Sequence, residues 1–399
     1  MKVLIVNKFL YPNGGSETYI FELGKQLQSM GHEVQYFGME HEGRIVGNHA
    51  RQYTSDTDFH GKGLKKLAYP FRILYSVEAR KKLRIVLKDF EPDIVHLNNF
   101  NFQLTPSIIY EIRDFEAKTG HRIKIVYTAH DSQLVCPNHL MMQPDHTLCT
   151  KCVEGSSVNC MKNRCIHGSF VKSILGTLEA GIYRKNHIYR QIDTVISPSE
   201  FLKKKLECSP DLSGRILVKH NFVGTIPKYD KKEEQPYVLY FGRYSQEKGV
   251  ETLLKVCDRL PDIPFVFAGS GPLEDMINAR SNIENRGFLS GEKLYHTIAQ
   301  AAICVIPSEC YENCPFSVME SQLCGTPVIA TNQGGIPELL QENVTGELFE
   351  AGNADALEAK IKDLWYDQKR LSEYSQNCNQ MCFATVDEYC REIIDIYEK

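Results

Sequence analysis

The chain has 399 residues, which is too long for one ordinary hydrophobic core and fits two domains of about 150–200 residues each. Its net charge of −4 excludes a general attraction to nucleic acid or anionic lipid, and no run of about 18 apolar residues could span a membrane. We expect a cytoplasmic protein that binds no nucleic acid. The apolar start of the chain is interrupted by Lys8 and lacks a cleavage site, so it predicts a buried first strand and not a signal peptide.

Short apolar runs alternate with helical patterns along the whole chain. Six runs in the first half have the character of buried strands, at residues 3–6, 33–38, 93–98, 124–130, 193–199 and 215–221. Five more follow in the second half, at residues 237–242, 264–269, 302–308, 325–331 and 346–349. Runs that are apolar on both faces and separated by helices predict parallel sheets covered on both sides. The predicted fold class is therefore α/β, with two Rossmann-like, doubly wound parallel-sheet domains.

The segment 223–235 is the best linker, because periodicity is lost there and glycine, proline and charge gather. We expect a first domain over residues 1–224 and a second over residues 237–380. The last helical pattern, over residues 381–399, is expected to pack back on the first domain. Ligands of open parallel sheets bind beyond the carboxyl ends of the strands, so we expect the site in a cleft between the domains.

Two loops at predicted strand ends suggest anion binding. The loop 12–17 has two adjacent glycines before a helix, which lets a ligand approach the backbone at a helix N-terminus. Alone it is more often an ordinary turn, and it lacks the dinucleotide pattern of an NAD oxidoreductase. In the second half, Arg243 and Lys248 follow a buried strand directly and could neutralise a diphosphate. A solvated basic turn is the alternative for that loop.

The strongest pattern runs from Glu312 to Glu320. Glu312 precedes a predicted helix and Glu320 lies one turn inside it, so the two carboxylates reach different parts of one ligand. Carboxylates accept hydrogen bonds from paired hydroxyls, as in a sugar or a ribose, and the first helical turn offers N–H groups to phosphate. Two surface glutamates around a helix start are the alternative.

This spacing resembles the E-x7-E motif of family 4 glycosyltransferases, which have the GT-B fold. The segments GRYSQEKGV, FAGSGP, GFLSG, CGTPVIAT and GGIPELL surround it in the family's order, and GGSE and TAHD match in the first half. The resemblance implies retaining transfer of a sugar from a nucleotide diphosphate donor, with UDP expected, to a saccharide acceptor. It is closest to members that assemble capsule, exopolysaccharide or lipopolysaccharide, and it implies no catalytic metal.

The resemblance also gives each matched residue a role. Gly15 would approach the donor phosphate, and Arg243 and Lys248 would clamp the diphosphate. Glu312 would bind hydroxyls of the donor sugar, and Glu320 would hold the ribose. The backbone beside sugar and phosphate would come from Phe316, Ser317 and Val318. The catalytic set implied in this way is His130, Arg243, Lys248 and Glu312.

The comparison with the family also concerns the acceptor side, the base and the mechanism. His130 corresponds to the active-site histidine near the acceptor, and the base would contact the backbone near Leu289. The sequence Asn313-Cys314-Pro315 replaces the family's usual Gly-Phe-Gly, and the proline removes one backbone donor. No residue is clearly placed as a nucleophile, which favours front-side departure over double displacement.

Five of the 14 cysteines lie close together after His130. The C-x2-C spacing and the polar surroundings predict a small structural zinc site in an insert over about residues 136–167. The first-choice ligands are Cys149, Cys152, Cys160 and Cys165, with Cys136 as the substitute. Reduced thiols are the main alternative, followed by an iron–sulfur cluster or disulfides. The insert is expected to shape the acceptor pocket.

Residues 62–88 carry nine Lys or Arg against one Glu, interleaved with apolar residues. Such a segment suits an anionic membrane surface that displays a lipid-linked acceptor, and a solvated helix face explains it equally well. A phosphorylase and a nucleotide-sugar epimerase of the same fold are the enzymatic alternatives. A zinc-dependent binding protein is the alternative without catalysis.

Overall fold

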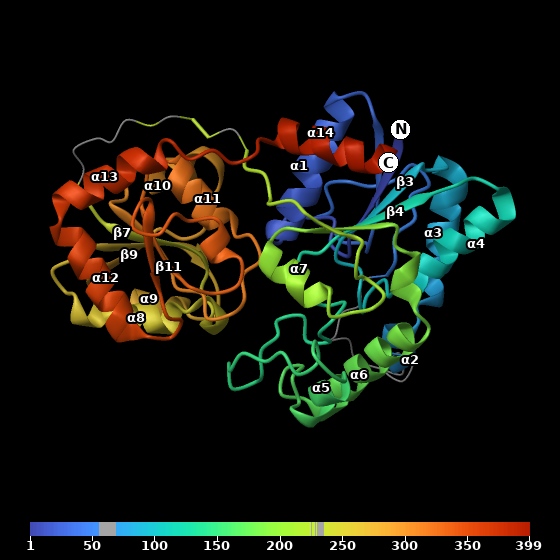
Figure 1. The fold of residues 1–399 in the computed structure, drawn as a ribbon, viewed down its shortest axis with the longest axis horizontal. Coiled ribbons are helices and arrows are strands. Elements are labelled where there is room, and N and C mark those ends of the chain that lie inside the picture. Colours follow the sequence, from blue (N-terminus) through green and yellow to red (C-terminus); the bar gives the residue numbers. More distant parts are fainter. Residues whose placement is uncertain (56–68, 225, 228, 230–234) are drawn as a thin grey trace. The chain divides into compact units, whose positions relative to one another are not determined.

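The computed structural model describes residues 1–55, 69–224, 226–227, 229 and 235–399 (Figure 1). The chain divides into two units. Unit 1 contains residues 1–220 and 386–399, and unit 2 contains residues 221–385. Part of the linker expected over 223–235 lies outside the described residues. The Val223 N–H donates to the Ala384 carbonyl at 3.0 Å, so the first and last segments of unit 2 lie side by side.

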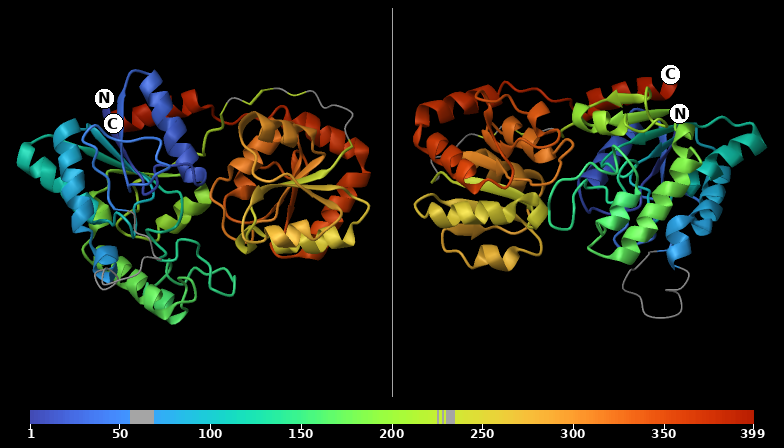
Figure 2. Two further views of the ribbon diagram at one scale, coloured as in Figure 1. Left: turned by 180° about the vertical axis from the view of Figure 1, so that it is seen from behind. Right: turned by 60° about the horizontal axis from the view of Figure 1, so that its bottom comes forward.

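Unit 1 is built on a parallel six-stranded sheet with the strand order β2-β1-β3-β4-β5-β6. The strands are β1 Lys2–Val6, β2 Glu33–Phe37, β3 Ile94–Leu97, β4 Lys124–Thr128, β5 Thr194–Ser197 and β6 Ile216–Val218. The helices are α1 Gly15–Ser29, α2 Tyr69–Leu74, α3 Val77–Phe90, α4 Ser107–Thr119, α5 Val158–Lys162, α6 Phe170–Lys185, η2 Ile188–Gln191 and α7 Glu200–Leu206. Residues 3–6 are fully buried because helices cover both faces of the sheet (Figure 2). The predicted doubly wound sheet is confirmed.

The C-terminal helix α14 (Val386–Glu398) belongs to unit 1 and packs against α1. The Tyr389 hydroxyl lies 3.0 Å from the hydroxyl of Tyr19, and Gln26 Nε2 donates to Asp387 at 3.0 Å. The return of this helix to the first half of the chain agrees with the sequence prediction.

Unit 2 has a second parallel six-stranded sheet, in the order β12-β11-β10-β7-β8-β9. The strands are β7 Val238–Arg243, β8 Phe265–Ser270, β9 Ile283–Asn285, β10 Ile303–Ile306, β11 Val328–Thr331 and β12 Gly346–Phe349. The helices are η3 Gln246–Lys248, α8 Val250–Arg259, α9 Glu274–Asn278, α10 Gly291–Gln300, α11 Phe316–Leu323, η4 Ile336–Glu338, α12 Ala354–Tyr366 and α13 Gln368–Cys378. Strand β9 was not predicted, because only one of its three residues is apolar.

Alternating residues of β7 enter two separate cores. Val238 and Tyr240 pack in one core with Leu253 of α8 and Leu357 of α12. Leu239 packs on the opposite face, in a core that also contains residues of α10 and α11. Burial on both faces fixes the strand in place, so the loops that leave the carboxyl ends of the sheet start from rigid positions.

Candidate active site

Neighbouring strands in unit 2 bring Lys248 and Glu312 together at their carboxyl ends. Lys248 Nζ lies 2.5 Å from Glu312 Oε1, and Ser308 Oγ donates to the same oxygen at 2.7 Å. The two charged residues are 64 positions apart in the sequence and meet because β7 and β10 pair in parallel. Ser308 was not singled out from the sequence, although a serine directly after a buried strand is a usable signal at such a sheet edge.

The ion pair stays charged at neutral pH. Burial alone would raise the pKa of Glu312, but the Lys248 ammonium and the Ser308 hydroxyl outweigh it, so the pKa is lowered. Burial likewise works against the charge of Lys248, but the Glu312 carboxylate raises the pKa of this ammonium above its ordinary value. The Glu312 carboxylate can therefore accept hydrogen bonds from hydroxyl groups of a ligand, and the Lys248 ammonium can bind its phosphate groups.

Two glycines after β11 hold the backbone of Glu312. Gly334 has φ +63°, and a Cβ on it would come within 2.0 Å of the Glu312 carbonyl oxygen. Gly335 N–H donates to that same oxygen at 2.7 Å. Only glycine fits this approach, so the GGIPELL segment positions the Glu312 side chain through its backbone.

Helix α11 begins at Phe316, directly after Pro315, and no side chain of the described residues caps it. The Val318 N–H donates to the Pro315 carbonyl at 3.2 Å, so the N–H groups of Phe316 and Ser317 are the ones in the first turn that are available to an anionic ligand. Phe316 and Ser317 are half-buried and Val318 is fully buried. The side chain of Val318 consequently packs in the core, and its backbone carbonyl accepts a hydrogen bond from Gln322 Nε2 at 3.0 Å.

The remaining predicted donor residues also belong to unit 2. Arg243 is exposed at the end of β7. Glu320 is half-buried one turn into α11, and burial raises its pKa to about 7. Leu289 is half-buried against the core after β9, whereas its neighbour Phe288 is 76% exposed. Phe288 is an exposed aromatic that sequence reasoning did not single out.

The departure from the family motif has a structural explanation. Cys314 is buried, and its Sγ accepts the Asn221 N–H at 3.2 Å. Asn221 Nδ2 donates to the Cys314 carbonyl at 3.0 Å. Cys314 therefore holds the segment at which unit 2 begins. Pro315 directly precedes helix α11, where a missing backbone N–H is least costly.

In unit 1, His130 follows β4 and is held in one tautomer by Asn98. Both amide hydrogens of Asn98 go to backbone carbonyls, of His96 at 3.2 Å and Val6 at 3.4 Å. Its Oδ1 therefore faces His130 Nε2, 2.8 Å away, and this nitrogen carries the proton. Burial lowers the pKa of His130 to about 4 against the opposing effect of Asp131, so the ring is neutral at pH 7.

The first loop of unit 1 is built around a buried carboxylate. Glu17 accepts hydrogen bonds from Asn7 Nδ2 at 2.8 Å and from Ser16 Oγ at 2.9 Å. Helix α1 begins at Gly15, which is exposed. Tyr19, one turn later, contacts the His130 ring edge-on at 4.9 Å between centroids. The predicted residues Gly15 and His130 therefore lie at one edge of the same sheet, with supporting residues that the sequence did not reveal.

Comparison with known proteins identifies the family. Residues 13–225, more than half of the chain, match the model of Glycosyltransferase Family 4, and residues 225–381 match that of Glycosyl transferases group 1. The chain belongs to glycosyltransferase family 4. The two matches together span residues 13–381 and so fall on both units.

Relatives of this family 4 glycosyltransferase differ in how far they align. Sulfoquinovosyl transferase SQD2 of Arabidopsis thaliana is 34% identical over 34% of this chain and 28% of its own length. The first three curated relatives are matched over only 28%, 60% and 48% of their lengths. N-acetyl-alpha-D-glucosaminyl L-malate synthase of Bacillus anthracis is 22% identical over 97% of this chain and 94% of its length.

Solved structures establish the GT-B fold. Sucrose-phosphate synthase of Thermosynechococcus elongatus superposes with a TM-score of 0.71 at 17% identity, covering 100% of this chain and 98% of that one. HepE of Anabaena, solved in complex with UDP and glucose, has a TM-score of 0.67 at 16% identity and covers 100% of both chains. At these identities the likeness concerns the fold alone.

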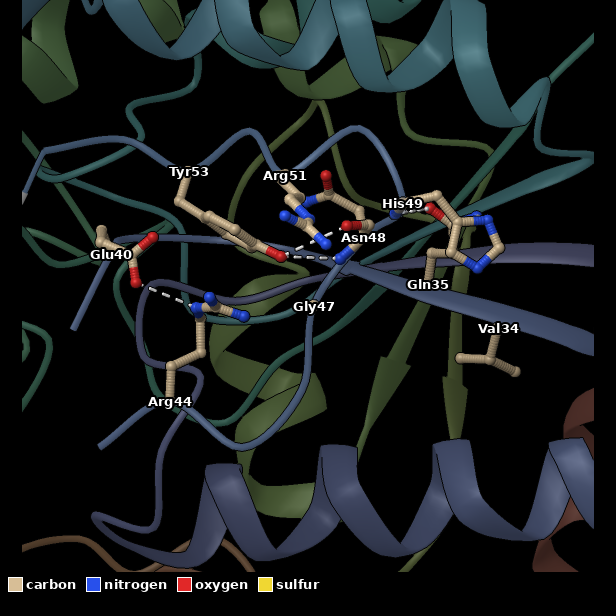
Figure 3. Close-up of a pocket in the computed structure, with 9 residues that line it drawn as sticks. All are labelled: Val34, Gln35, Glu40, Arg44, Gly47, Asn48, His49, Arg51 and Tyr53. Atoms are coloured by element: carbon tan, nitrogen blue, oxygen red, sulfur yellow. Dashed lines mark hydrogen bonds and ion pairs between the residues drawn. The ribbon is translucent and has the colours of Figure 1, made fainter. Parts of the chain in front are cut away.

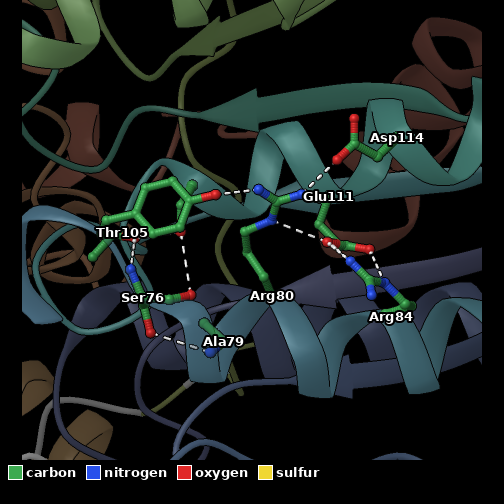
Figure 4. A network of polar contacts seen from close by, with 9 residues as sticks. Ser76, Ala79, Arg80, Arg84, Thr105, Glu111 and Asp114 are labelled. Atoms are coloured by element: carbon green, nitrogen blue, oxygen red, sulfur yellow. Dashed lines mark hydrogen bonds and ion pairs between the residues drawn. The ribbon is translucent and has the colours of Figure 1, made fainter.

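In the basic segment over residues 62–88, most cations that the structure describes form ion pairs. Residues 62–68 lie outside the described part. Ion pairs hold four of its cations: Arg72, Arg80, Lys82 and Arg84. Buried Glu111 of α4 forms ion pairs with both arginines of α3, Arg80 and Arg84 (Figure 4). Glu78 forms ion pairs with Arg72 and Lys82. In the described ranges, no helix has the length and apolar character needed to cross a bilayer.

A pocket of about 560 Å³ lies beside β2 in unit 1 (Figure 3). Residues that line it bond to one another: the Arg44 side chain pairs with Glu40 at 3.0 Å, and the backbone N–H of Asn48 donates to the Tyr53 hydroxyl at 2.9 Å. None of the predicted site residues lines it. The pocket is therefore distinct from the strand ends that carry the candidate active site.

The predicted metal ligands are free thiols. Cys152 and Cys160 are buried, and Cys149 and Cys165 are half-buried. The substitute, Cys136, is buried as well. Among the residues that the structure describes, no three or more Cys, His, Asp or Glu side chains already stand in an arrangement that could hold a metal ion.

Proposed function

We propose that this family 4 glycosyltransferase moves a sugar from a UDP-sugar to a saccharide acceptor with retention of the anomeric configuration. One observation carries the proposal: Lys248, Glu312 and Ser308 meet at the strand ends of unit 2, next to the uncapped start of α11. This cluster joins a cation for phosphate to a carboxylate for sugar hydroxyls.

The donor would lie along the strand ends of unit 2. Arg243 and Lys248 would neutralise the diphosphate together with the N–H groups of α11. Glu312 would accept hydrogen bonds from the sugar, and Glu320 would accept them from the ribose. The choice of UDP is supported by HepE, whose structures contain UDP, UDP with glucose, or UDP-glucose.

Retention would follow from front-side departure of the diphosphate. Glu312 Oε1 already accepts hydrogen bonds from Lys248 and Ser308, which suits a binding role better than nucleophilic attack. The leaving phosphate would then take the proton of the acceptor hydroxyl as the new glycosidic bond forms. Most of the rate enhancement would come from cations and helix N–H groups that stabilise the departing charge.

A screen of donor hydrolysis tests this proposal. The protein is incubated with UDP-, GDP- and ADP-sugars, and proton NMR follows the anomer released within the first minutes. We expect hydrolysis of a UDP-sugar, with the released sugar in the donor's own configuration. Release of the opposite anomer contradicts retention, and activity with inorganic phosphate but without a nucleotide sugar indicates a phosphorylase.

The acceptor is proposed to be lipid-linked and presented at an anionic membrane surface. The support is the basic composition of residues 62–88, and the pairing of Arg72, Arg80, Lys82 and Arg84 limits how much attraction the described part can contribute. Flotation with vesicles containing anionic lipid at low salt tests it. We expect the protein to float with these vesicles and not with neutral ones, and absence of flotation removes the membrane claim.

A further inference from the structure

Helix α6 of unit 1 carries small and polar residues inward and apolar residues outward. Its buried residues are Ser173, Gly176, Thr177, Glu179, Ala180 and Tyr183. Its exposed large apolar residues are Phe170, Val171, Leu178 and Ile182. A helix on the surface of a soluble domain normally packs its apolar stripe against the core. The outward face of α6 is therefore a surface that another molecule is expected to cover.

The exposed apolar residues of α6 form a continuous stripe. Val171, Leu178 and Ile182 are seven and four residues apart, and these spacings return to the same side of an α-helix. The three side chains are 66%, 47% and 41% exposed, in that order. Half-buried Leu175 lies on the same side, between Val171 and Leu178. We call these four residues the α6 stripe, and it runs along most of the helix.

Polar contacts of the inward face fix the orientation of α6. The Thr177 hydroxyl donates to the Ser157 carbonyl at 3.1 Å. The Tyr183 hydroxyl donates to the Leu74 carbonyl at 2.7 Å. Rolling the helix to bury its stripe would break these hydrogen bonds, and buried carbonyls without donors are costly. The outward position of the α6 stripe is therefore built into the fold of unit 1.

Helix α6 is also joined to the sheet edge that carries His130. Glu179 accepts a hydrogen bond from Asn101 Nδ2 at 3.4 Å, and Asn101 lies in the loop that follows β3. Asn98, in the same loop, contacts the His130 ring at 2.8 Å. The α6 stripe thus belongs to the part of unit 1 in which the acceptor is expected.

Unpaired cations accompany the α6 stripe. Helix α6 packs against α5 and α2 (Figure 1). Over residues 151–185, which the structure describes throughout, five Lys or Arg residues are exposed: Lys151, Lys162, Arg164, Lys172 and Lys185. None of the five forms an ion pair with a residue that the structure describes, and Glu154 is the one exposed acidic residue of this range. This part of unit 1 therefore combines exposed apolar side chains with positive charge.

We propose that the α6 stripe and its accompanying cations lie on an anionic lipid bilayer. Apolar side chains of such a helix sink into the headgroup region, and neighbouring cations bind lipid phosphate. A second copy of the chain fits less well, because a two-fold interface would bring the same five cations face to face. The inference rests on the lipid-linked acceptor proposed above. It assigns the membrane contact to α6, whereas most described cations of residues 62–88 are already paired.

Flotation of variants tests the apolar part of this contact. The unaltered chain and the double variant Leu178→Ser/Ile182→Ser are compared on vesicles of phosphatidylglycerol and phosphatidylcholine. The double variant should bind about tenfold or more weakly, because two large apolar side chains no longer enter the bilayer. Ile85→Ser is the matched control, since Ile85 is as exposed as Leu178, at 47%, but lies on α3 within residues 62–88. Equal binding by the double variant and the unaltered chain overturns the proposal, and so does an equal loss in Ile85→Ser.

The charges and the direct contact are tested separately. Lys172→Gln and Lys185→Gln should each weaken binding about fivefold at low salt, and the effect should shrink at high salt. The added tryptophan signal of Leu178→Trp should shift to the blue when vesicles are added, while Trp365 of unit 2 gives the background in the unaltered chain. Binding that is indifferent to both lysines, or a signal that does not shift, overturns the proposal.

Donor hydrolysis separates this inference from the proposed reaction. The double variant Leu178→Ser/Ile182→Ser should hydrolyse a soluble UDP-sugar at the rate of the unaltered chain, because α6 lies outside unit 2. Absence of hydrolysis from both proteins counts against the proposed reaction, and flotation still decides the role of α6. An unaltered chain that hydrolyses the donor but does not float overturns the membrane contact alone. A dimer that the double variant loses in ultracentrifugation, with unchanged flotation, assigns the α6 stripe to a second copy and overturns the proposal.

Discussion

The pairing of Lys248 with Glu312 predicts a measurable coupling between the two side chains. Replacing Lys248 by Met leaves the Glu312 carboxylate with the Ser308 hydrogen bond but without its counter-charge. The Lys248 and Glu312 side chains are 34% and 14% exposed. The pair therefore falls between exposed pairs, which contribute up to about 1 kcal/mol, and fully buried pairs, whose disruption costs about 3–5 kcal/mol. We expect Lys248→Met to lower the unfolding free energy of unit 2 by about 1–3 kcal/mol.

The single tryptophan of the chain gives an assay specific to this unit. Trp365 lies in α12 and packs against the core that contains β7. Its fluorescence during urea unfolding can be compared for Lys248→Met, Glu312→Gln and the double variant. We expect the double variant to lose at least about 1 kcal/mol less than the sum of the single losses, because the two side chains act on each other.

Exposed Lys255 on α8 supplies the matched control, and Lys255→Met should change stability by no more than about 0.5 kcal/mol. Turnover of the donor by Lys248→Met should also fall by about 10²–10³-fold, which is the usual cost of losing one stabilising donor. Losses that add within about 0.5 kcal/mol in the double variant refute the reasoning.

Three further predictions concern other parts of the two units. Asn98→Asp should raise the pKa of His130 from about 4 by about 1–3 pH units, because a carboxylate at Nε2 stabilises the imidazolium, and an NMR titration of the ring that still gives about 4 contradicts the contact between residue 98 and the ring. Gly334→Ala should cost at least about 1–2 kcal/mol in urea unfolding, since the new Cβ meets the Glu312 carbonyl at φ +63°, and wild-type stability would speak against that contact. Nucleotide affinity should fall as the pH drops below about 7, because protonated Glu320 cannot accept bonds from both ribose hydroxyls. Calorimetry should show this dependence absent in Glu320→Gln, and a pH profile that persists in this variant contradicts the ribose role.

The fold could be predicted largely because parallel strands buried on both faces are apolar throughout. Val238, Leu239 and Tyr240 each enter a core, so the whole run is visible in the sequence. Strand β9 was not predicted from the sequence because Ile283–Asn285 is an edge strand with two polar residues. A short edge strand depends on its pairing with β8 and not on its own burial, and pairing leaves no local pattern.

The candidate site was predicted where a residue acts through its own charge and missed where it acts on a neighbour. Lys248 and Glu312 were found as charged groups at strand ends. Asn98 and Ser308 were missed because their importance lies in one contact across the sheet, to His130 and to Glu312 respectively. Sequence spacing gives no information about such partners until the strand order is known.

Unit 2 is proposed to hold a nucleotide diphosphate through cations at its strand ends. Titration calorimetry of UDP with the unaltered chain and with Arg243→Ala tests it most directly. Arg243 is exposed, so its loss should leave the unfolding midpoint of unit 2 unchanged while weakening UDP binding about 10–100-fold, as expected for a lost charge-assisted hydrogen bond. Equal affinity in both proteins, or no binding of UDP to the unaltered chain at millimolar concentration, contradicts the account.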